Sequence, residues 1–476
     1  MRRTKIIATL GPATDKPEVL AELIKAGTDV MRINFSHGSW EDRARRIQLV
    51  RDLSAAAGRH VAILGDLQGP KIRIHRFRDG PVELAEGQAF TLDTAMDPAA
   101  GGPHGVGVAY EQLPQDVVAG DVLLLDDGQI AMRVDQVDGS RIACTVTSGG
   151  RLSDNKGINR QGGGLSAPAL SAKDREDIRL AAGADIDWLA VSFVRDAGDM
   201  HEARSLLRQA GCGAHLVAKI ERAEAVANLE RIIDASDAVM VARGDLGVEM
   251  GYAGLTGLQK KILRLTRARH KVAITATQMM ESMIHQRLPT RAEVSDVANA
   301  VIDGTDAVML SAETAVGEFP VRAVTAMAEI CVGAEAYQLS SGWARERAND
   351  RFEMVDEAIA MAVMYTANHL RPLAIAALTE SGSTPLWMSR VRTDIPIFAF
   401  TRHEATRRRV QLYRGVYPLA YDITHSDPMI VNLEMMAMLR DIGHVEEGDL
   451  VIITKGDFTG ISGGTNTMKI LKVPGA

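Results

Sequence analysis

Eight apolar segments, each ending in polar residues, constrain the fold of this chain more than any other feature of its sequence. Helix-like stretches join most of the later segments. Apolar strands that alternate with helices are typical of a parallel sheet covered on its outer face. Eight such units predict a closed (β/α)8 barrel of the TIM type, with its active site at the C-terminal ends of the strands. The segments are KIIATLGP (5–12), DVMRINFSH (29–37), HVAILGDL (60–67), DWLAVSFVR (187–195), HLVAKIE (215–221), AVMVARGDL (238–246), VAITATQM (272–279) and AVMLSAET (307–314).

The connection between the third and fourth segments is far too long for one helix and a turn. It contains short β-like runs separated by Gly-rich turns, so we expect an inserted all-β domain at residues 70–165. The barrel then consists of residues 1–69 and 166–340. An insertion that leaves a strand–helix loop lies over the active-site face, which favours a lid with its return hinge in INRQGGGLSAP (158–168).

A polar stretch, SGWARERANDRFEMVDEA (341–358), predicts a second boundary. Beyond it the sequence indicates a helix from Asp356 to Leu370 and strands near LAIAALTES, IPIFAFT and LVIITKG. These features predict a third, smaller α/β domain at residues 345–476.

Composition restricts the classes of partner. The net charge of −7 gives no general reason to expect nucleic acid or an anionic membrane, and an aromatic content of 4% disfavours base stacking. The three cysteines form no metal-binding or disulfide pattern, which favours a reducing cytoplasm. The basic start of the chain lacks a signal-peptide apolar region, and no stretch is long enough to span a membrane.

Polar residues follow the predicted strands, where a barrel would bring them to one face. Lys219 and Glu221 are two residues apart and so share a face of their strand, which either a salt bridge or a functional site would explain. Glu221 and Asp245 follow adjacent strands and could share a hard divalent cation such as Mg²⁺. The full set is Arg32, Asn34, Ser36, Asp66, Arg73, Lys219, Glu221, Asp245, Thr277 and Ser311.

The cations in this set favour an anionic substrate. Arg32, Arg73 and Lys219 suit a phosphorylated or carboxylated ligand. The turn ARGDLGVE also supplies backbone N–H groups at Gly244 and Asp245 that can hold an anion. Each residue also has a purely structural alternative, and the combination at one barrel mouth is a stronger signal than any member.

Several long motifs are spread over essentially the whole chain: TKIIATLGPA, MRINFSHG, GPKIR, VSFVR, KIE, ARGDLGVE, TATQMMESM, PTRAEVSDVANAVIDGTDAVMLSAETAVGEFP, YRGVYP and GGTNTMKI. Together they resemble the motifs of the pyruvate kinase family. The resemblance implies a barrel domain, a β-barrel lid and a C-terminal α/β domain. It also implies the transfer of a phosphoryl group from phosphoenolpyruvate to ADP, giving pyruvate and ATP in the last step of glycolysis, with Mg²⁺ or Mn²⁺ as cofactor and a homotetrameric assembly.

The resemblance also implies roles for individual residues. Glu221 and Asp245 would hold the Mg²⁺ that binds phosphoenolpyruvate, while Lys219 and Arg32 would contact the phosphoryl group. The N–H groups of Gly244 and Asp245, with Thr277, would receive the substrate carboxylate. Arg73, His37 and Asn34 would face the nucleotide and its own Mg²⁺. A relay near Thr277 and Ser311 would protonate the enolate, with the donor itself left open.

One departure from the family pattern concerns K⁺. Members that require K⁺ typically have Glu where this chain has Lys71 and Thr where it has Leu67. In those members Asn34, Ser36, Asp66 and the carbonyl of residue 67 would hold the ion. The ammonium of Lys71 is expected to substitute for it, so K⁺ would not be required; the alternative is that Lys71 points to solvent and K⁺ still binds.

Two other functions remain as alternatives. A metal-dependent aldolase or lyase acting on pyruvate or oxaloacetate would use the same metal ligands, but would need neither ADP nor a lid. A non-catalytic metabolite sensor is disfavoured by the intact set of metal and phosphate ligands. Many family members carry a Lys where this chain has Val316, so any phosphate or proton chemistry of that Lys is absent here. The loop containing Asp457 lacks the usual residues for a sugar bisphosphate, so the effector stays open.

Overall fold

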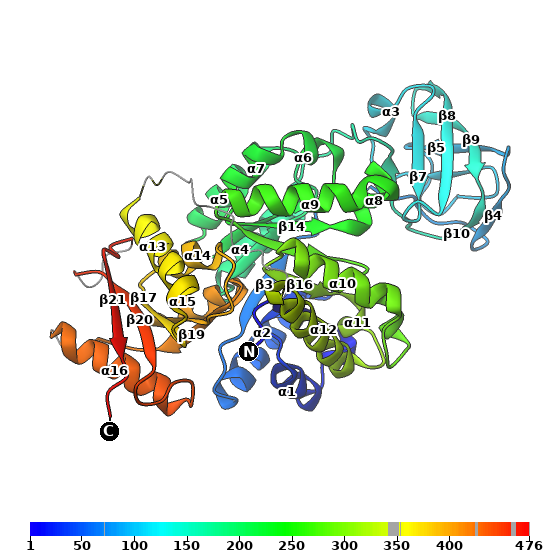
Figure 1. Cartoon of the computed structure of the whole chain (residues 1–476). Helices are drawn as coiled ribbons and strands as arrows, with labels where there is room; N and C mark the ends of the chain where they lie inside the picture. The colour runs from blue at the N-terminus through cyan, green and yellow to red at the C-terminus, as the bar shows by residue number, and fades with distance from the viewer. Residues whose placement is uncertain (71, 341–351, 353, 424–426, 458–462, 476) are drawn as a thin grey trace. The chain divides into compact units, whose positions relative to one another are not determined.

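The computed structural model describes the chain except for residues 71, 341–351, 353, 424–426, 458–462 and 476 (Figure 1). By its internal contacts the chain divides into two compact units. The first unit contains residues 1–65, 184–188 and 266–476, and the second contains residues 66–183 and 189–265. This division cuts across the barrel strands, so it differs from the domain boundaries expected from the sequence, and each unit is described by itself.

Eight parallel strands form a closed barrel in the order β1-β16-β15-β14-β13-β12-β3-β2. Each of the eight predicted segments contains one of these strands, which confirms the predicted (β/α)8 architecture. Six of them, β1, β3, β12, β14, β15 and β16, are buried at every position, as expected for strands covered on both faces. The strands are β1 (Lys5–Thr9), β2 (Val30–Asn34), β3 (Ala62–Asp66), β12 (Trp188–Val191), β13 (His215–Ile220), β14 (Ala238–Ala242), β15 (Val272–Ala276) and β16 (Ala307–Leu310).

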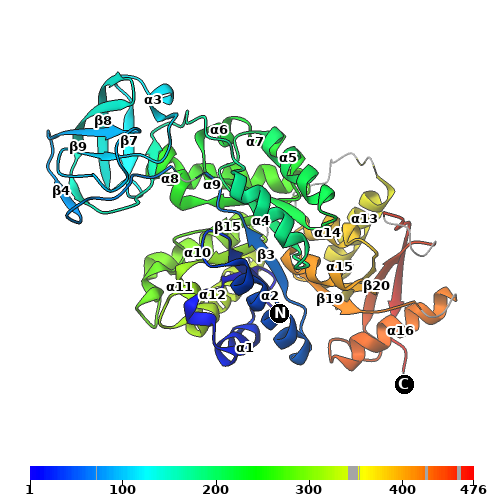
Figure 2. The same ribbon diagram turned by 180° about the vertical axis from the view of Figure 1, so that it is seen from behind.

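Helices that follow the strands of the first unit pack against one another. In Figures 1 and 2, α12 (Pro320–Ser340) lies beside both α1 (Pro17–Ala26) and α10 (Arg291–Asp303), and α1 also contacts α2 (Trp40–Ala56). Helix α10 begins with a capping box between Thr290 and Glu293 and ends at Gly304, whose φ of 94° is readily adopted only by glycine. These signals stop the helix just before β16 and so set where that strand begins.

In the second unit, further helices connect the barrel strands. Strand β12 is preceded by α4 (Ala172–Ala182) and followed by α5 (Ala197–Gln209), and α6 (Ala223–Ala227) and α7 (Leu229–Ala235) join β13 to β14. Helix α8 (Arg243–Met250) starts directly after β14, and α9 (Tyr252–Ala268) follows it. The direct passage from β14 into α8 places the first turn of that helix at the carboxyl end of the barrel strand.

The inserted domain is rich in β-strands, as predicted. A six-stranded sheet has the order β11-β7-β8-β9-β5-β6, and β10 pairs with β4 in a second, two-stranded sheet. One short helix, α3 (Leu113–Asp116), interrupts the expected all-β character. The strands are β4 (Val82–Leu84), β5 (Ala89–Asp93), β6 (Gly105–Gly107), β7 (Val122–Leu125), β8 (Ile130–Asp138), β9 (Arg141–Ser148), β10 (Gly150–Leu152) and β11 (Ile158–Arg160).

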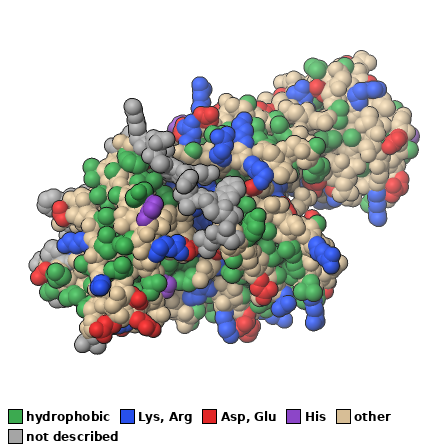
Figure 3. Space-filling view, viewed as in Figure 1, with side chains coloured by type: hydrophobic (Ala, Val, Ile, Leu, Met, Phe, Trp, Pro, Cys, Tyr) green, Lys and Arg blue, Asp and Glu red, His purple; other side chains and the backbone are tan. Residues whose placement is uncertain are grey.

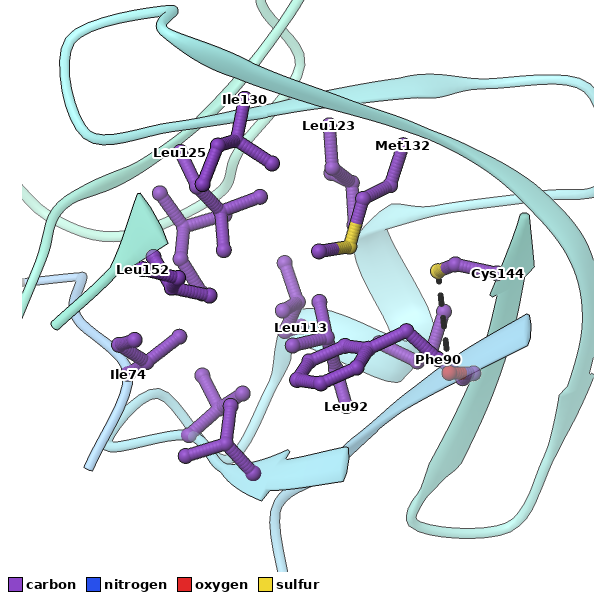
Figure 4. Packing of buried hydrophobic residues seen from close by; sticks show 14 of the residues in the cluster. Ile74, Phe90, Leu92, Leu113, Leu123, Leu125, Ile130, Met132, Cys144 and Leu152 are labelled. Atoms are coloured by element: carbon purple, nitrogen blue, oxygen red, sulfur yellow. Dashed lines mark hydrogen bonds between the residues drawn. The ribbon is translucent and has the colours of Figure 1, made fainter. Parts of the chain in front are cut away.

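This domain has a hydrophobic core of its own. Phe90, Leu92, Leu125 and Met132 point into it from different strands (Figure 4), and each is at most 1% exposed. Cys144 lies in the same core and donates a weak hydrogen bond from Sγ to the carbonyl of Ile142, at 3.8 Å. A separate core allows the insertion to move as a body.

The C-terminal part is an α/β domain, as predicted. Its sheet has the order β19-β18-β17-β20-β21, and the edge strand β21 pairs antiparallel with β20. The predicted helix and three predicted strands are present, whereas β19 and β21 were not predicted. The elements are α13 (Val355–Leu370), β17 (Ala374–Leu378), α14 (Ser383–Ser389), β18 (Ile397–Thr401), α15 (Glu404–Arg409), β19 (Val416–Ala420), α16 (Pro428–Asp441), β20 (Leu450–Lys455) and β21 (Thr467–Lys472).

Within the described residues, no helix is both long enough and apolar enough to cross a bilayer. On the face shown in Figure 3, acidic and basic side chains are interspersed with hydrophobic ones.

Candidate active site

Lys219 lies near the end of β13 and joins residues from three strand ends of the second unit. Its ammonium is 2.8 Å from Oε1 of Glu221 and 3.4 Å from Oδ1 of Asp66, and it donates a 2.7 Å hydrogen bond to Oγ of Ser192. Asp66 and Glu221 are 1% and 2% exposed. The predicted common face of Lys219 and Glu221 is therefore observed, and the pair forms a partly buried salt bridge.

Glu221 is held on its second oxygen as well. The backbone N–H of Phe193 donates to Oε2 at 2.7 Å. Phe193 has a φ of 55°, which is unusual for a residue with a side chain, and the guanidinium of Arg222 lies 5.7 Å from its ring centre. The loop after β12 thus adopts a strained conformation that aims an N–H group at the carboxylate.

Asp245 is the third residue of α8 and experiences the charge of Glu221. Burial and then the negative charge of Glu221 raise the pKa of Asp245 to about 7, against the opposing effect of Lys219. Two neighbouring carboxylates repel each other when both are ionised, and a nearby cation stabilises the doubly ionised form. The summed negative charge of the three ionised carboxylates, Asp66, Glu221 and Asp245, is larger than the single positive charge of Lys219. The side chains present therefore fit a divalent cation.

No group of three or more His, Cys, Asp and Glu side chains in the described part of the chain is arranged to hold a metal by itself. Mg²⁺ does not require one, because it typically takes one or two carboxylates and completes its shell with water and substrate oxygens. Glu221 and Asp245 match that requirement.

A second group of site residues lies in the first unit. Arg32 at the end of β2 donates from Nη1 to Oγ1 of Thr9 at 3.1 Å, and Thr9 donates to the carbonyl of Leu310 at 2.8 Å. The N–H of Thr9 donates in turn to Oγ1 of Thr314 at 3.0 Å. These hydrogen bonds connect β1, β2 and β16 and hold the side chain of Arg32 in place.

Ser311 and Thr277 follow β16 and β15. The N–H of Ser311 donates to Oε2 of Glu313 at 2.7 Å, and Oε1 of the same carboxylate accepts from the N–H of Met280 at 3.1 Å. Thr277 and Gln278 have φ values of 65° and 51°, so this segment also adopts left-handed backbone conformations. Such conformations cost of order 1–3 kcal/mol each and cluster at functional sites.

The remaining predicted residues on β2 and its loop are held locally. Oδ1 of Asn34 accepts from the N–H of Ser36 at 3.0 Å. The carbonyl of His37 accepts from Nε of the buried Arg43 at 3.2 Å. The loop that carries these three residues is therefore ordered by its own hydrogen bonds.

Arg73 and Leu67 lie at the junction with the inserted domain. Arg73 donates from Nη1 to the carbonyl of Asn155 at 2.8 Å and pairs by its backbone with Gly157, so it belongs to the inserted domain's own framework. The carbonyl of Leu67 accepts from Oγ of Ser192 at 2.7 Å. Gly244 is the second residue of α8. Lys71 lies outside the described residues.

Sequence reasoning missed two features of this site. Ser192 links Lys219 to Leu67, and it could have been found by the same rule as the others, because it directly follows β12. Glu249, at the far end of α8, accepts from the N–H of Ala223 at 2.9 Å, and its own carbonyl accepts from the N–H of Gly162 at 3.0 Å. Burial raises the pKa of Glu249 to about 7. No local sequence pattern predicts the contacts of Glu249 with Ala223 and Gly162.

Comparison with known proteins agrees with this architecture. Residues 1–324 match the family model "Pyruvate kinase, barrel domain", and residues 357–471 match "Pyruvate kinase, alpha/beta domain". The chain is 53% identical to pyruvate kinase II of Salmonella typhimurium over 99% of both chains, and 50% identical to a pyruvate kinase of Haemophilus influenzae over 96% of both. A crystal structure of a pyruvate kinase from Cryptosporidium parvum is similar with a TM-score of 0.91 and 33% identity, covering 99% of this chain and 96% of that one.

Proposed function

Because this chain belongs to the pyruvate kinase family and is a phosphotransferase, we propose that it transfers the phosphoryl group of phosphoenolpyruvate to ADP in the cytoplasm. The bond between phosphorus and the enol oxygen breaks, a bond to the terminal oxygen of ADP forms, and the enolate takes a proton at carbon to become pyruvate. The observation that carries this proposal is the partly buried ammonium of Lys219, 2.8 Å from Glu221.

The family implies a divalent metal, and Glu221 and Asp245 are the residues proposed to hold Mg²⁺, or Mn²⁺ in its place. When bound, the ion would neutralise phosphate charge at the reacting group. The raised pKa of Asp245 supports this assignment, because burial and the charge of Glu221 disfavour the ionised carboxylate and a bound cation would offset both effects. Removal of the metal by a chelator should abolish activity, and retained activity would contradict the assignment.

Lys219 and Arg32 are proposed to contact the transferring phosphoryl group. Phosphoryl transfer depends mainly on positioning and charge stabilisation, which two preorganised cations can provide. The N–H groups of Gly244 and Asp245 at the start of α8 and the hydroxyl of Thr277 would receive the substrate carboxylate. Ser311 and Thr277 would belong to the relay that protonates the enolate.

The nucleotide is proposed to bind near Arg73, His37 and Asn34. With Arg73 in the inserted domain, closure of that domain would bring its guanidinium to the nucleotide phosphates. We propose that the insertion, residues 70–165, acts as this lid and turns at Gly162–Gly164, where all three φ values are positive. Slower hydrogen exchange at this hinge on adding substrates and Mg²⁺ tests the motion, and unchanged exchange would refute it.

The proposed assembly is a homotetramer of subunits with barrel residues 1–69 and 166–340 and an α/β domain at 345–476. Sedimentation of the purified protein tests the assembly, and a stable monomer at assay concentration would refute it.

A coupled assay for pyruvate distinguishes the kinase from the alternative lyase. Phosphoenolpyruvate, Mg²⁺ and ADP should give pyruvate and ATP in equal amounts, and omission of ADP should stop both. Release of pyruvate from phosphoenolpyruvate without ADP, or from oxaloacetate at a comparable rate, would overturn the proposal.

A further inference from the structure

The inserted domain is joined to the barrel by two connections, and the loops after β12 and β13 together contact both of them. The outgoing connection is described over residues 67–70. The other connection, which we call the return segment, comprises residues 161–170 between β11 and α4. Both connections belong to the second compact unit, together with Phe193 and Glu221 in these two loops.

Two arginines hold consecutive carbonyls of the return segment. Arg222, which follows β13, donates from Nη1 to the carbonyls of Leu165 and Ala167, both at 3.3 Å. Arg195, which follows β12, donates from Nη1 to the carbonyl of Ser166 at 3.1 Å. These hydrogen bonds attach the return segment to the ends of two neighbouring barrel strands.

Arg222 also contacts the residue that orients Glu221. Its guanidinium lies 5.7 Å from the ring centre of Phe193, within the range of a cation–π interaction. Arg222 is 2% exposed, so this contact is shielded from water. The N–H of Phe193 donates to Oε2 of Glu221 at 2.7 Å. Arg222 is therefore connected to Glu221 through Phe193 as well as through the chain itself.

The adjacent positions of Glu221 and Arg222 explain why their side chains serve different parts of the structure. The chain stays extended after β13, and Arg222 has φ −117° and ψ 153°. Neighbouring side chains of an extended segment point to opposite sides. The carboxylate of Glu221 therefore contacts Lys219, whereas the guanidinium of Arg222 contacts the return segment.

The ring of Phe193 packs against the outgoing connection. A Cβ atom on Gly69 would lie 2.8 Å from Cδ2 of this ring and 3.0 Å from Cβ of Ser192. Gly69 also has a φ of 70°, which residues with side chains rarely adopt. The glycine thus allows a close approach between the outgoing connection and Phe193. Both connections therefore meet at Phe193, one directly and the other through Arg222.

A purely structural role explains only part of this arrangement. Buried carbonyl groups need hydrogen-bond donors, and both Arg195 and Arg222 supply them to the return segment. That need does not explain why the guanidinium of Arg222 lies against the residue whose N–H holds Glu221.

We propose that Arg222 is a positioning residue for the phosphoryl transfer, which links the return segment to Phe193 and so couples the position of the inserted domain to the orientation of Glu221. This inference rests on the proposed function, in which Glu221 binds the divalent metal and the inserted domain acts as a lid. When the return segment moves, Arg222 moves with its two carbonyl acceptors and shifts the ring of Phe193. By linkage, metal binding and lid position then influence each other equally.

Binding of Mn²⁺ to the intact protein, measured by electron paramagnetic resonance of the free ion, tests this link without an activity assay. Glu221→Gln identifies the bound Mn²⁺ that belongs to the candidate site. Arg222→Met should weaken that binding by about tenfold, because losing a group that orients a metal ligand typically costs about 10–100-fold in affinity. Arg222→Lys keeps a positive charge beside the ring and should bind Mn²⁺ more tightly than Arg222→Met. Unchanged Mn²⁺ affinity in Arg222→Met would overturn the proposal.

The matched control is Arg195→Met, which removes the other arginine bound to the return segment. It should speed hydrogen exchange in the return segment and leave the affinity for Mn²⁺ unchanged. If Arg195→Met weakened Mn²⁺ binding as much as Arg222→Met, any loosening of the return segment would suffice, and the specific role of Arg222 would be wrong.

Hydrogen exchange of the return segment measures the coupling in the opposite direction. Mn²⁺ should slow this exchange in the wild type and in Arg195→Met. In Arg222→Met it should not, even at a Mn²⁺ concentration that saturates the weakened site. Equal protection by Mn²⁺ in the wild type and Arg222→Met, or none in the wild type, contradicts the coupling.

Phe193→Leu provides an independent test if Arg222→Met does not fold. It keeps the backbone N–H but removes the ring, so it should weaken Mn²⁺ binding to a similar extent. Where both variants fold, the double variant should bind Mn²⁺ no more weakly than either single variant, because residues that act as a unit have non-additive effects. Additive losses would show that Arg222 does not act through Phe193.

These outcomes are distinguishable from a failure of the proposed function. A wild type that makes no pyruvate from phosphoenolpyruvate and ADP refutes the kinase activity, whatever the Mn²⁺ measurements give. An active wild type whose Mn²⁺ affinity is unaffected by Arg222→Met keeps the kinase activity and refutes only the role of Arg222.

Discussion

At the residue scale, Lys219 shows that a salt bridge and a catalytic candidate can be the same side chain. Its ammonium contacts Glu221, Asp66 and Ser192 in a buried setting, so its position is fixed without any ligand. A group held in place by its neighbours needs no reorganisation when charge develops next to it, which is the basis of electrostatic catalysis.

We expect Lys219→Met to lower kcat by about a hundredfold or more, because one preorganised electrostatic contact is lost. The KM for phosphoenolpyruvate should change little if Arg32 and the metal still bind the phosphate. Steady-state kinetics with thermal unfolding as a folding check measures both effects. Lys173→Met, which removes an α4 lysine paired with Asp177, is the control and should keep normal turnover. Near-normal turnover of the Lys219 variant would remove it from the catalytic group.

We also expect substantial activity without K⁺, because Lys71 would bring a tethered positive charge to the region of Asn34, Ser36, Asp66 and Leu67. The assay uses tetramethylammonium as the monovalent cation with Mg²⁺ present, and adding KCl at constant ionic strength should have little effect. Lys71→Glu should reduce activity and make part of it recoverable with K⁺. Strong activation of the wild type by K⁺, but not by Na⁺, would contradict this.

At the element scale, helix α8 connects the candidate active site to the hinge of the inserted domain. Its first turn carries Gly244 and Asp245, and its last turn carries Glu249, which contacts Ala223 and Gly162. Gly164 in the same hinge donates its N–H to the carboxylate of Glu224. A change at Glu249 is therefore expected to act on the attachment of the hinge and not on the reacting groups.

The raised pKa of Glu249 predicts a pH-dependent stability with a definite sign. The ordinary value is 4.5 and the folded value is about 7, so the folded state binds more protons between these pH values. Stability should therefore fall as pH rises from about 4.5 through 7, by about 3 kcal/mol in total from this group. The Glu249→Gln variant keeps a neutral acceptor for the N–H of Ala223, so its unfolding free energy should not show this decrease with pH. Above pH 7 the variant should be more stable than the wild type.

Urea unfolding of both proteins at several pH values measures the difference. Glu176→Gln, which changes an exposed carboxylate of α4, should unfold with the same pH dependence as the wild type. If the unfolding free energies of the wild type and Glu249→Gln changed with pH in parallel, the prediction of a raised pKa for Glu249 would be wrong.

At the scale of the whole molecule, a buried ion pair joins the barrel to the C-terminal α/β domain within the first unit. Arg390, just after α14, engages Asp306, just before β16, and the two side chains are 1% and 2% exposed. Asp306 also accepts from the N–H groups of Ala273 and Arg414. Removing either partner leaves a buried charge without its counterpart.

We expect Arg390→Met to cost about 3–5 kcal/mol of unfolding free energy, as is typical of breaking a buried pair. The double variant Arg390→Met/Asp306→Asn should lose less than the sum of the single changes, because the second change removes the uncompensated charge. Arg371→Met breaks the more exposed pair with Asp394 and should cost about 0–1 kcal/mol. Equal losses at the two pairs, measured by urea unfolding, would contradict the structural role of Arg390.

The sequence by itself determined the eight barrel strands, the β-rich insertion and the C-terminal α/β domain. Each follows from short-range patterns: continuous apolar runs, glycine-rich turns and polar residues at strand ends. The spacing of Lys219 and Glu221 likewise fixed their common face, because side-chain direction alternates along a strand. The short helix α3 and the edge strand β21 were missed because their patterns are short, and the partner of β21 is chosen by the sheet.

Only the tertiary structure decided which groups meet across long stretches of chain. It placed Ser192 between Lys219 and Leu67, and it joined Glu249 to the hinge 87 residues earlier in the chain at Gly162. These arrangements have no local signature, because burial and the field of distant charges set them, and both depend on how the elements pack.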